Sequence, residues 1–124
     1  MLGQALNVVA EEVIEGRIVF GGDTAPFQGV SVELVLEDTT YADSPAIPVA
    51  RLVLSSVSYD GAVGGSIAFA LRRDAVAPGR RQTLRILVDV DGDGRLGRGD
   101  YGNAESVPVL PGSTRDLVVR VRRV

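Results

Sequence analysis

The chain has 124 residues, a formal net charge of −3 and 13 basic residues, all of them arginine. It contains no lysine, histidine or cysteine. Their absence excludes a Schiff-base lysine, a thiol nucleophile, a disulfide, a zinc–thiolate site and a histidine-based serine triad. We therefore expect one domain, residues 1–124, that buries its own hydrophobic core and is not an enzyme.

The distribution of apolar and charged residues excludes further classes. No apolar run approaches the roughly 20 residues that span a bilayer, and the opening segment lacks the basic region and cleavage site of a signal peptide. Residues 1–60 hold 9 acidic and 2 basic groups, whereas residues 61–124 hold 7 acidic and 11 basic groups. The overall balance is not basic and no aromatic residues alternate with the arginines, so we do not expect nucleic-acid binding.

The first part of the chain predicts two strands. Residues 1–11 are expected to form a loose arm or an edge strand, and residues 12–20 form a strand that ends at a Gly-Gly-Asp turn. Residues 28–37 alternate between apolar and polar side chains, which is typical of a half-buried strand. The apolar face of that strand consists of Val30, Val32, Leu34 and Leu36.

The middle of the chain continues the same pattern. A long polar connection, residues 38–46, leads to a strand over residues 48–57, and residues 66–72 alternate again. Residues 73–79 are compatible with one helical turn or a loop, and residues 83–89 form the next strand. The side chains expected to face inward are Leu52, Leu54, Ile67, Phe69, Leu71, Leu84, Ile86 and Val88.

Two more strands complete the prediction, over residues 101–109 and 117–122. About seven short strands with regular turn signals favour an immunoglobulin-like or transthyretin-like antiparallel β-sandwich, with a partly open barrel as the next choice. In the last strand Leu117, Val119 and Val121 are expected to face inward. Its arginines are expected to protect a sheet edge; an acidic protein partner and anionic lipid headgroups remain alternatives. These arginines are Arg115, Arg120, Arg122 and Arg123.

The segment from Asp89 to Asp100 predicts a calcium site. It places aspartates at positions 1, 3, 5 and 12 of a loop, a glycine at position 6 and an apolar residue at position 8, as in an EF-hand loop. The expected ligands are Asp89, Asp91, Asp93, the carbonyl of Arg95, and Asp100. We expect a structural Ca²⁺ ion with a dissociation constant of about 10⁻⁴–10⁻³ M. The alternative is a solvated Asp-Gly turn without a metal ion.

The polar connection contains two groups of short polar residues, Asp38-Thr39-Thr40 and Asp43-Ser44-Pro45. Their side chains are expected to accept hydrogen bonds from nearby backbone N–H groups and hold the connection in place. A surface for a ligand or partner that includes Tyr41 is the alternative.

The same connection carries a resemblance to a known family. Leu36, Asp38 and Thr39, followed by Ala42-Asp43 and Pro45-Ala46, resemble the central motif of the YbaY/YscW family of small bacterial envelope lipoproteins. The resemblance implies a β-sandwich located in the periplasm or cell envelope. One branch of the family acts as a pilotin, which binds and localises a secretin subunit in type III secretion. In this chain there is no cysteine that could carry a lipid, and the acidic loop stands where the family has a short hairpin.

These observations support three hypotheses. The first is a non-enzymatic envelope module that holds a peptide segment of a partner at a sheet edge or face, with a calcium ion fixing its last hairpin. The second is a structural, adhesion or accessory domain of a larger assembly. The third is a carrier of a small ligand between the sheets, which would need a cavity lined by leucine and valine. The sequence predicts neither the partner nor the oligomeric state.

Overall fold

The computed structural model describes residues 11–21, 24–61, 65–112 and 114–124. The arm expected over residues 1–11 lies outside this part of the chain, except for Glu11, which begins the first strand. The seven strands are β1 (Glu11–Phe20), β2 (Phe27–Asp38), β3 (Ile47–Tyr59), β4 (Ser66–Asp74), β5 (Gln82–Asp89), β6 (Tyr101–Asn103) and β7 (Leu117–Arg123). The segment that could have formed a helical turn is the end of β4 and a loop.

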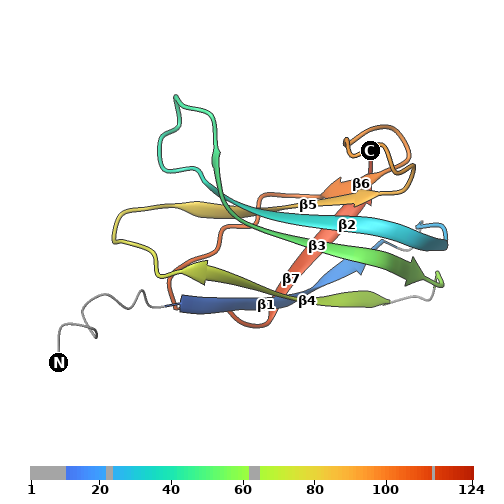
Figure 1. Cartoon of the computed structure of the whole chain (residues 1–124), viewed down its shortest axis with the longest axis horizontal. Coiled ribbons are helices and arrows are strands. Elements are labelled where there is room, and N and C mark those ends of the chain that lie inside the picture. The colour runs from blue at the N-terminus through green and yellow to red at the C-terminus, as the bar shows by residue number, and fades with distance from the viewer. Residues whose placement is uncertain (1–10, 22–23, 62–64, 113) are drawn as a thin grey trace.

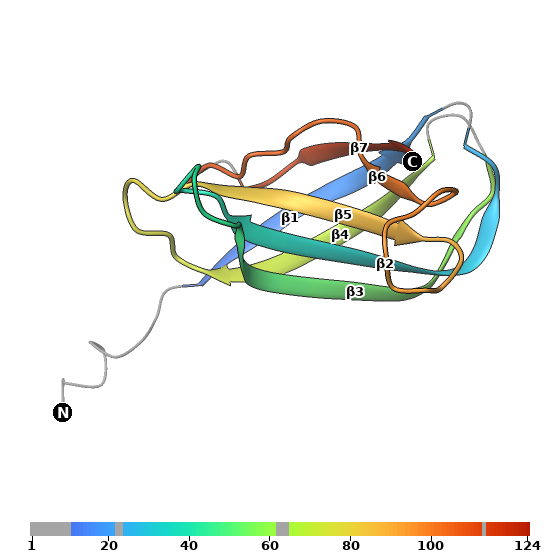
Figure 2. The same ribbon diagram turned by 90° about the horizontal axis from the view of Figure 1, so that it is seen from above.

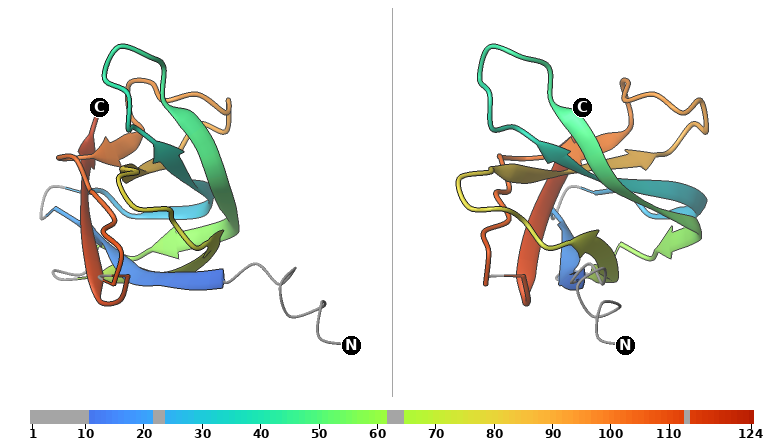
Figure 3. Two further views of the ribbon diagram at one scale, coloured as in Figure 1. Left: turned by 90° about the vertical axis from the view of Figure 1, so that its left-hand side faces the viewer. Right: turned by 60° about the vertical axis from the view of Figure 1, so that its left-hand side comes forward.

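All seven strands belong to one sheet, in the order β3-β2-β5-β6-β7-β1-β4. Neighbouring strands are antiparallel except β1 and β7, which are parallel. The sheet curls until its two end strands, β3 and β4, approach each other (Figures 1 and 2). The result is a nearly closed barrel, visible from its end in Figure 3. The predicted all-β fold of about seven strands is confirmed, but the strands do not form a clear two-layer sandwich, because β7 pairs with both β6 and β1 and joins the expected layers into one hydrogen-bonded sheet.

The position of β7 also corrects the prediction for the basic last strand. Because β7 lies between two strands, its arginines do not protect a sheet edge. Val119 and Val121 face the core as expected, Leu117 is half-buried, and Arg120 and Arg122 lie on the outer face.

The parallel ladder between β1 and β7 begins where Gly16 lies opposite Leu117. A Cβ atom added to Gly16 would lie 2.8 Å from the Leu117 Cβ and 2.9 Å from the Phe69 Cζ. These separations are too short for any real Cβ contact. A glycine at this point therefore allows β7 and the ring from β4 to approach β1 closely.

The inward faces of the strands fill the barrel, as the alternation predicts. The fully buried positions include Ile14, Ile18, Val32, Leu34, Leu36, Leu84, Ile86, Val88 and Val119. Four rings occupy the end of the barrel beside the acidic loop: Phe20, Phe27, Tyr59 and Tyr101, with the closest centroids, those of Phe20 and Tyr59, 4.6 Å apart. The core thus depends on aliphatic side chains along its length and on aromatic rings at one end.

The sixth strand is shorter than predicted, ending at residue 103 instead of 109. The side chain of Asn103 replaces the backbone in the ladder to β5. Its Oδ1 accepts a hydrogen bond from the Ile86 N–H at 2.6 Å, and its Nδ2 donates to the Leu84 carbonyl at 2.7 Å. An isolated bridge between Thr83 and Pro108 follows. Within the described residues, no helix has the length and apolar character needed to cross a membrane.

Candidate functional site

The acidic loop connects the end of β5 to the start of β6, at the end of the barrel that holds the aromatic rings. Gly92, Gly94 and Gly99 have φ angles of 76°, 77° and 96°, a region that favours glycine. These glycines allow the chain to turn repeatedly within a few residues. The turns bring residues at both ends of the loop together.

Two of the four aspartates are buried and organise the loop. Asp100 is fully buried; its Oδ1 accepts from the Val90 N–H at 2.8 Å and its Oδ2 from the Gly97 N–H at 2.9 Å. Asp89 accepts from the Gly92 N–H at 3.0 Å and from the Gly94 N–H at 2.7 Å. Through these hydrogen bonds, both carboxylates hold the backbone of the loop in place without a ligand.

The other two aspartates are exposed. Asp91 accepts a hydrogen bond from the Asp93 N–H at 3.2 Å, and Asp93 accepts one from the Arg95 N–H at 2.8 Å. The hydrogen bond from the Asp93 backbone lowers the pKa of Asp91, but desolvation and the carboxylates of Asp89, Asp93 and Asp100 outweigh it and raise that pKa. The pKa of Asp93 is lowered, chiefly by the hydrogen bond from the Arg95 backbone. The pKa values of Asp91 and Asp93 shift in opposite directions because several carboxylates lie close together in the loop.

The four carboxylates converge, as the spacing predicts. One oxygen from each of Asp89, Asp91, Asp93 and Asp100 lies within 4.8 Å of the others. Hard cations such as Ca²⁺ are bound in proteins by several such oxygens, so this cluster has the composition of a cation site. Arg95 is exposed in the same turn, and its carbonyl ligand stays a prediction. Neither Arg95 nor Arg98 forms an ion pair among the described residues.

The apolar residue at position 8 fixes the loop against the barrel. A Cβ atom on Gly102 would lie 3.4 Å from the Leu96 Cδ1, so Leu96 rests over the backbone of β6. The acidic loop is thus attached to the outer face of the sheet as well as to the end of β5.

The second candidate region is the opening between β3 and β4, which we call the seam. Each of these strands pairs on one side only among the described residues. The inward residues of β3 are only half-buried: Ala50, Leu52 and Leu54 pack against the core from the margin of the sheet. Three of the outward residues are also apolar: Ile47, Val49 and Val53 are 58%, 47% and 49% exposed. The sequence prediction did not identify this region, although the apolar character of both faces of β3 is a signal for it.

At the end of the barrel away from the β3–β4 turn, ion pairs link β4 and the loop after it to β1 and β2. Arg73 is buried; its Nη2 donates to Glu12 Oε2 at 2.8 Å and its Nη1 donates to Gln82 Oε1 at 2.8 Å. Arg80 donates to Asp38 Oδ2, with the Nη2 2.6 Å away. A hollow of about 280 Å³ lies beside these groups, between Val49 and the end of β4. Every guanidinium here has a carboxylate, so the arrangement is structural.

The hydrogen bonds of the polar connection support its predicted role as a rigid link. Asp38 Oδ1 accepts from the Thr40 N–H at 2.9 Å, and Thr40 Oγ1 accepts from the Arg81 N–H at 2.9 Å. Hydrogen bonds from Thr40, followed by the interaction with Arg80, lower the pKa of Asp38. Tyr41 is 63% exposed, with Arg80 5.4 Å from its ring centroid. Asp43 forms no described side-chain hydrogen bond, so its part of the prediction has no support.

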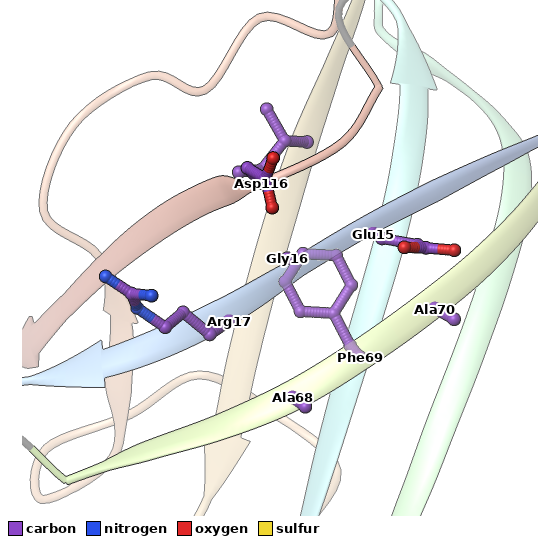
Figure 4. Close-up of a pocket in the computed structure, with 8 residues that line it drawn as sticks. Glu15, Gly16, Arg17, Ala68, Phe69, Ala70 and Asp116 are labelled. Carbon is purple, nitrogen blue, oxygen red and sulfur yellow. The ribbon is translucent and has the colours of Figure 1, made fainter.

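A shallow hollow of about 540 Å³ lies where β4, β1 and β7 meet (Figure 4). Its lining includes Glu15, Arg17, Ala68, Ala70 and Asp116. Phe69 and Leu117 also line it, but the hollow is shallow and bordered by three charged residues, whereas a carrier of an apolar ligand would need an enclosed space lined by leucine and valine.

Comparison with known proteins gives one similarity. No family model matches the sequence, and no curated protein matches it. The structure of an alternative pilotin from the type II secretion system of Vibrio cholerae matches with a TM-score of 0.69 and 16% sequence identity. The match covers 93% of this chain and 100% of that chain. At this identity the likeness is one of fold. A pilotin-like fold is thereby observed, whereas membership of the YbaY/YscW family stays a prediction.

Proposed function

We propose that the protein is a non-enzymatic binding module of the bacterial envelope that assists the assembly of a partner protein, as a pilotin does. The observation that carries this proposal is the fold match, which includes the whole of a type II secretion pilotin. The motif from Leu36 to Ala46, which resembles that of envelope lipoproteins, supports the same location. The partner is an envelope protein, and the location is the periplasm or a membrane surface facing it.

We further propose that the seam holds an extended segment of that partner. The backbone groups of β3 that face away from β2 have no ladder partner in the described chain. An added strand would satisfy them by hydrogen bonding, as in other cases of strand addition. It would also cover Leu52 and Leu54, which the core leaves half-exposed. Burial of apolar surface and backbone hydrogen bonding therefore act at the same place.

The strand directions restrict how such a segment enters. Following the ladders around the sheet, β3 and β4 run in opposite directions. A strand between them is antiparallel to one and parallel to the other. Its side chains alternate between the core side, beside Leu52, and the outside, beside Val53. The recognised sequence therefore has apolar residues at every second position.

Site-specific photo-crosslinking in cells tests the proposal. A photoreactive amino acid at Val53, beside the seam, should form an adduct with one envelope protein. The matched control is the same amino acid at Ser31, which lies on β2. The adduct should map to an extended apolar segment of the partner and disappear in a folded Leu52→Asp variant. Equal adducts from both positions, or none from Val53, would contradict the proposal.

The acidic loop is proposed to bind one Ca²⁺ ion that fixes the connection between β5 and β6. Four carboxylates lie close together, none of them in an ion pair among the described residues, and two of them are buried. A bound cation removes the repulsion among these charges. The role is structural, because the loop is attached to the sheet through Leu96 and Asp100.

Thermal unfolding tests this part of the proposal. A ligand that binds only the folded state stabilises it by mass action. With a dissociation constant of about 10⁻⁴–10⁻³ M, about 1 mM calcium raises the melting temperature by about 2–5 °C. Calcium should not raise the melting temperature of the variant Asp91→Asn/Asp93→Asn. In chelator, the variant and the wild type should have the same melting temperature. A wild-type melting curve that is the same in calcium and in chelator would contradict calcium binding.

A further inference from the structure

Three arginines share the outer face of the strands β1, β7 and β6. In the parallel ladder Arg17 lies opposite Val118, and Val19 lies opposite Arg120. Arg122 lies opposite Gly102 of β6. Because Ile18, Val119 and Val121 are buried inside the barrel, these arginines point outward. We call Arg17, Arg120 and Arg122 the arginine face.

The arginine face has no partner within the described chain. None of its three guanidinium groups has a carboxylate oxygen within 4.0 Å among the described residues. Glu15 and Asp116 line the same hollow as Arg17 on this outer face, and in Figure 4 the ends of the Arg17 and Glu15 side chains extend away from each other. The predicted role of edge protection does not apply, because β7 is an inner strand. Three unpaired positive charges remain on one side of a molecule whose net charge is −3.

Exposed apolar side chains accompany these charges. Val118 lies beside Arg17 and is 43% exposed, and Leu96 lies beyond Gly102 and is 51% exposed. A hollow of about 490 Å³ separates the acidic loop from the end of β7, with Leu96, Arg122 and Arg123 in its lining. Guanidinium groups bind phosphate oxygens in pairs, and their aliphatic stems lie along apolar surface.

We propose that the arginine face binds the surface of an anionic lipid bilayer. The arginines pair with headgroup phosphates, and Val118 and Leu96 contact the boundary of the apolar layer. An acidic protein segment would match the charges but leave these apolar side chains without a role. The acidic residues of β2 oppose binding little, because Glu33 and Glu37 are paired with Arg51 and Arg85. Charges farther from the bilayer than about 8 Å are screened at physiological salt.

Vesicle co-sedimentation of the full chain tests this proposal, which does not depend on the seam. The probes are vesicles of phosphatidylglycerol mixed with phosphatidylcholine, compared with vesicles of phosphatidylcholine alone. The test variant is Arg17→Gln/Arg120→Gln/Arg122→Gln. The matched control is Arg51→Gln/Arg72→Gln/Arg81→Gln, which has the same net charge and removes exposed arginines elsewhere. Melting temperatures establish that both variants are folded.

The wild type should bind the anionic vesicles, release them as salt increases, and ignore neutral vesicles. Each arginine near the surface contributes about a fivefold change in affinity, so the test variant should bind about 100-fold more weakly and the control variant much less so. Equal losses in both variants, or no binding by the wild type, would overturn the proposal. So would displacement by millimolar inorganic phosphate, which indicates a free-anion site, or binding of an acidic peptide without binding of vesicles.

Discussion

The two ends of the barrel differ in the partners of their carboxylates. At the end away from the acidic loop, Glu12 is paired with Arg73 and Asp38 with Arg80. At the other end the acidic loop gathers four carboxylates that accept hydrogen bonds from backbone N–H groups and form no ion pair among the described residues. At the first end, arginines of the chain itself neutralise these carboxylates. The second has an excess of negative charge that a cation from solution can neutralise.

Removing Arg73 should produce the largest effect on the ion-paired end. The variant Arg73→Met leaves Glu12 and Gln82 without their donor and should lower the free energy of unfolding by about 3 kcal/mol. The loss is limited because the Glu12 side chain is 32% exposed and can be rehydrated. Urea unfolding measures it, with Arg72→Met as the exposed control, for which less than about 0.5 kcal/mol is expected. Equal losses in the two variants would show that the ion pair at this end contributes nothing specific.

The aspartates of the acidic loop should separate into two kinds. In chelator, Asp100→Ala should cost about 2 kcal/mol, because the buried N–H groups of Val90 and Gly97 lose their acceptor. Asp91→Asn, at an exposed position, should cost less than about 0.5 kcal/mol under the same conditions. Urea unfolding without calcium measures both. Similar costs for the two variants would contradict the division between an organising and a metal-facing carboxylate.

Acid should weaken the ion-paired end through Asp38, with a smaller effect. Hydrogen bonds from Thr40 and then the Arg80 guanidinium hold the pKa of this carboxyl below its ordinary value of 3.8. The charged form is therefore favoured in the folded state, so its contribution is complete above that value and is lost as the pH falls through the lowered pKa. The stability difference between the wild type and Asp38→Asn should shrink below pH 3.8. Unfolding midpoints over a pH series measure it; a difference that grows on acidification would contradict this sign.

Local features of the fold were predictable from the sequence, and the strand order was not. Alternation identified the inward residues of β2 and β5 because side-chain direction in a strand depends only on position. Closure of the barrel depends on Leu117 meeting Gly16, about a hundred residues earlier in the chain. No local pattern predicts that contact; a glycine within a strand is the one sign that another backbone approaches there.

The same distinction applies to the candidate sites. The acidic cluster was predictable because all four aspartates lie within one turn-rich loop, so their spacing determines their convergence. The seam was not, because β3 and β4 follow each other in the chain across a short turn and yet do not pair, which no local pattern indicates. Its sequence signal is the presence of Val49 and Val53 on the face of β3 opposite Leu52, which is unusual for a strand with one solvated face.

A calorimetric titration of calcium into the wild type and into Asp91→Asn/Asp93→Asn tests the contrast between the two ends most directly. We expect one ion bound per chain in the wild type, with a dissociation constant of about 10⁻⁴–10⁻³ M, and no binding by the variant. Absence of binding heat in the wild type at millimolar calcium, or the same isotherm in both proteins, would contradict it.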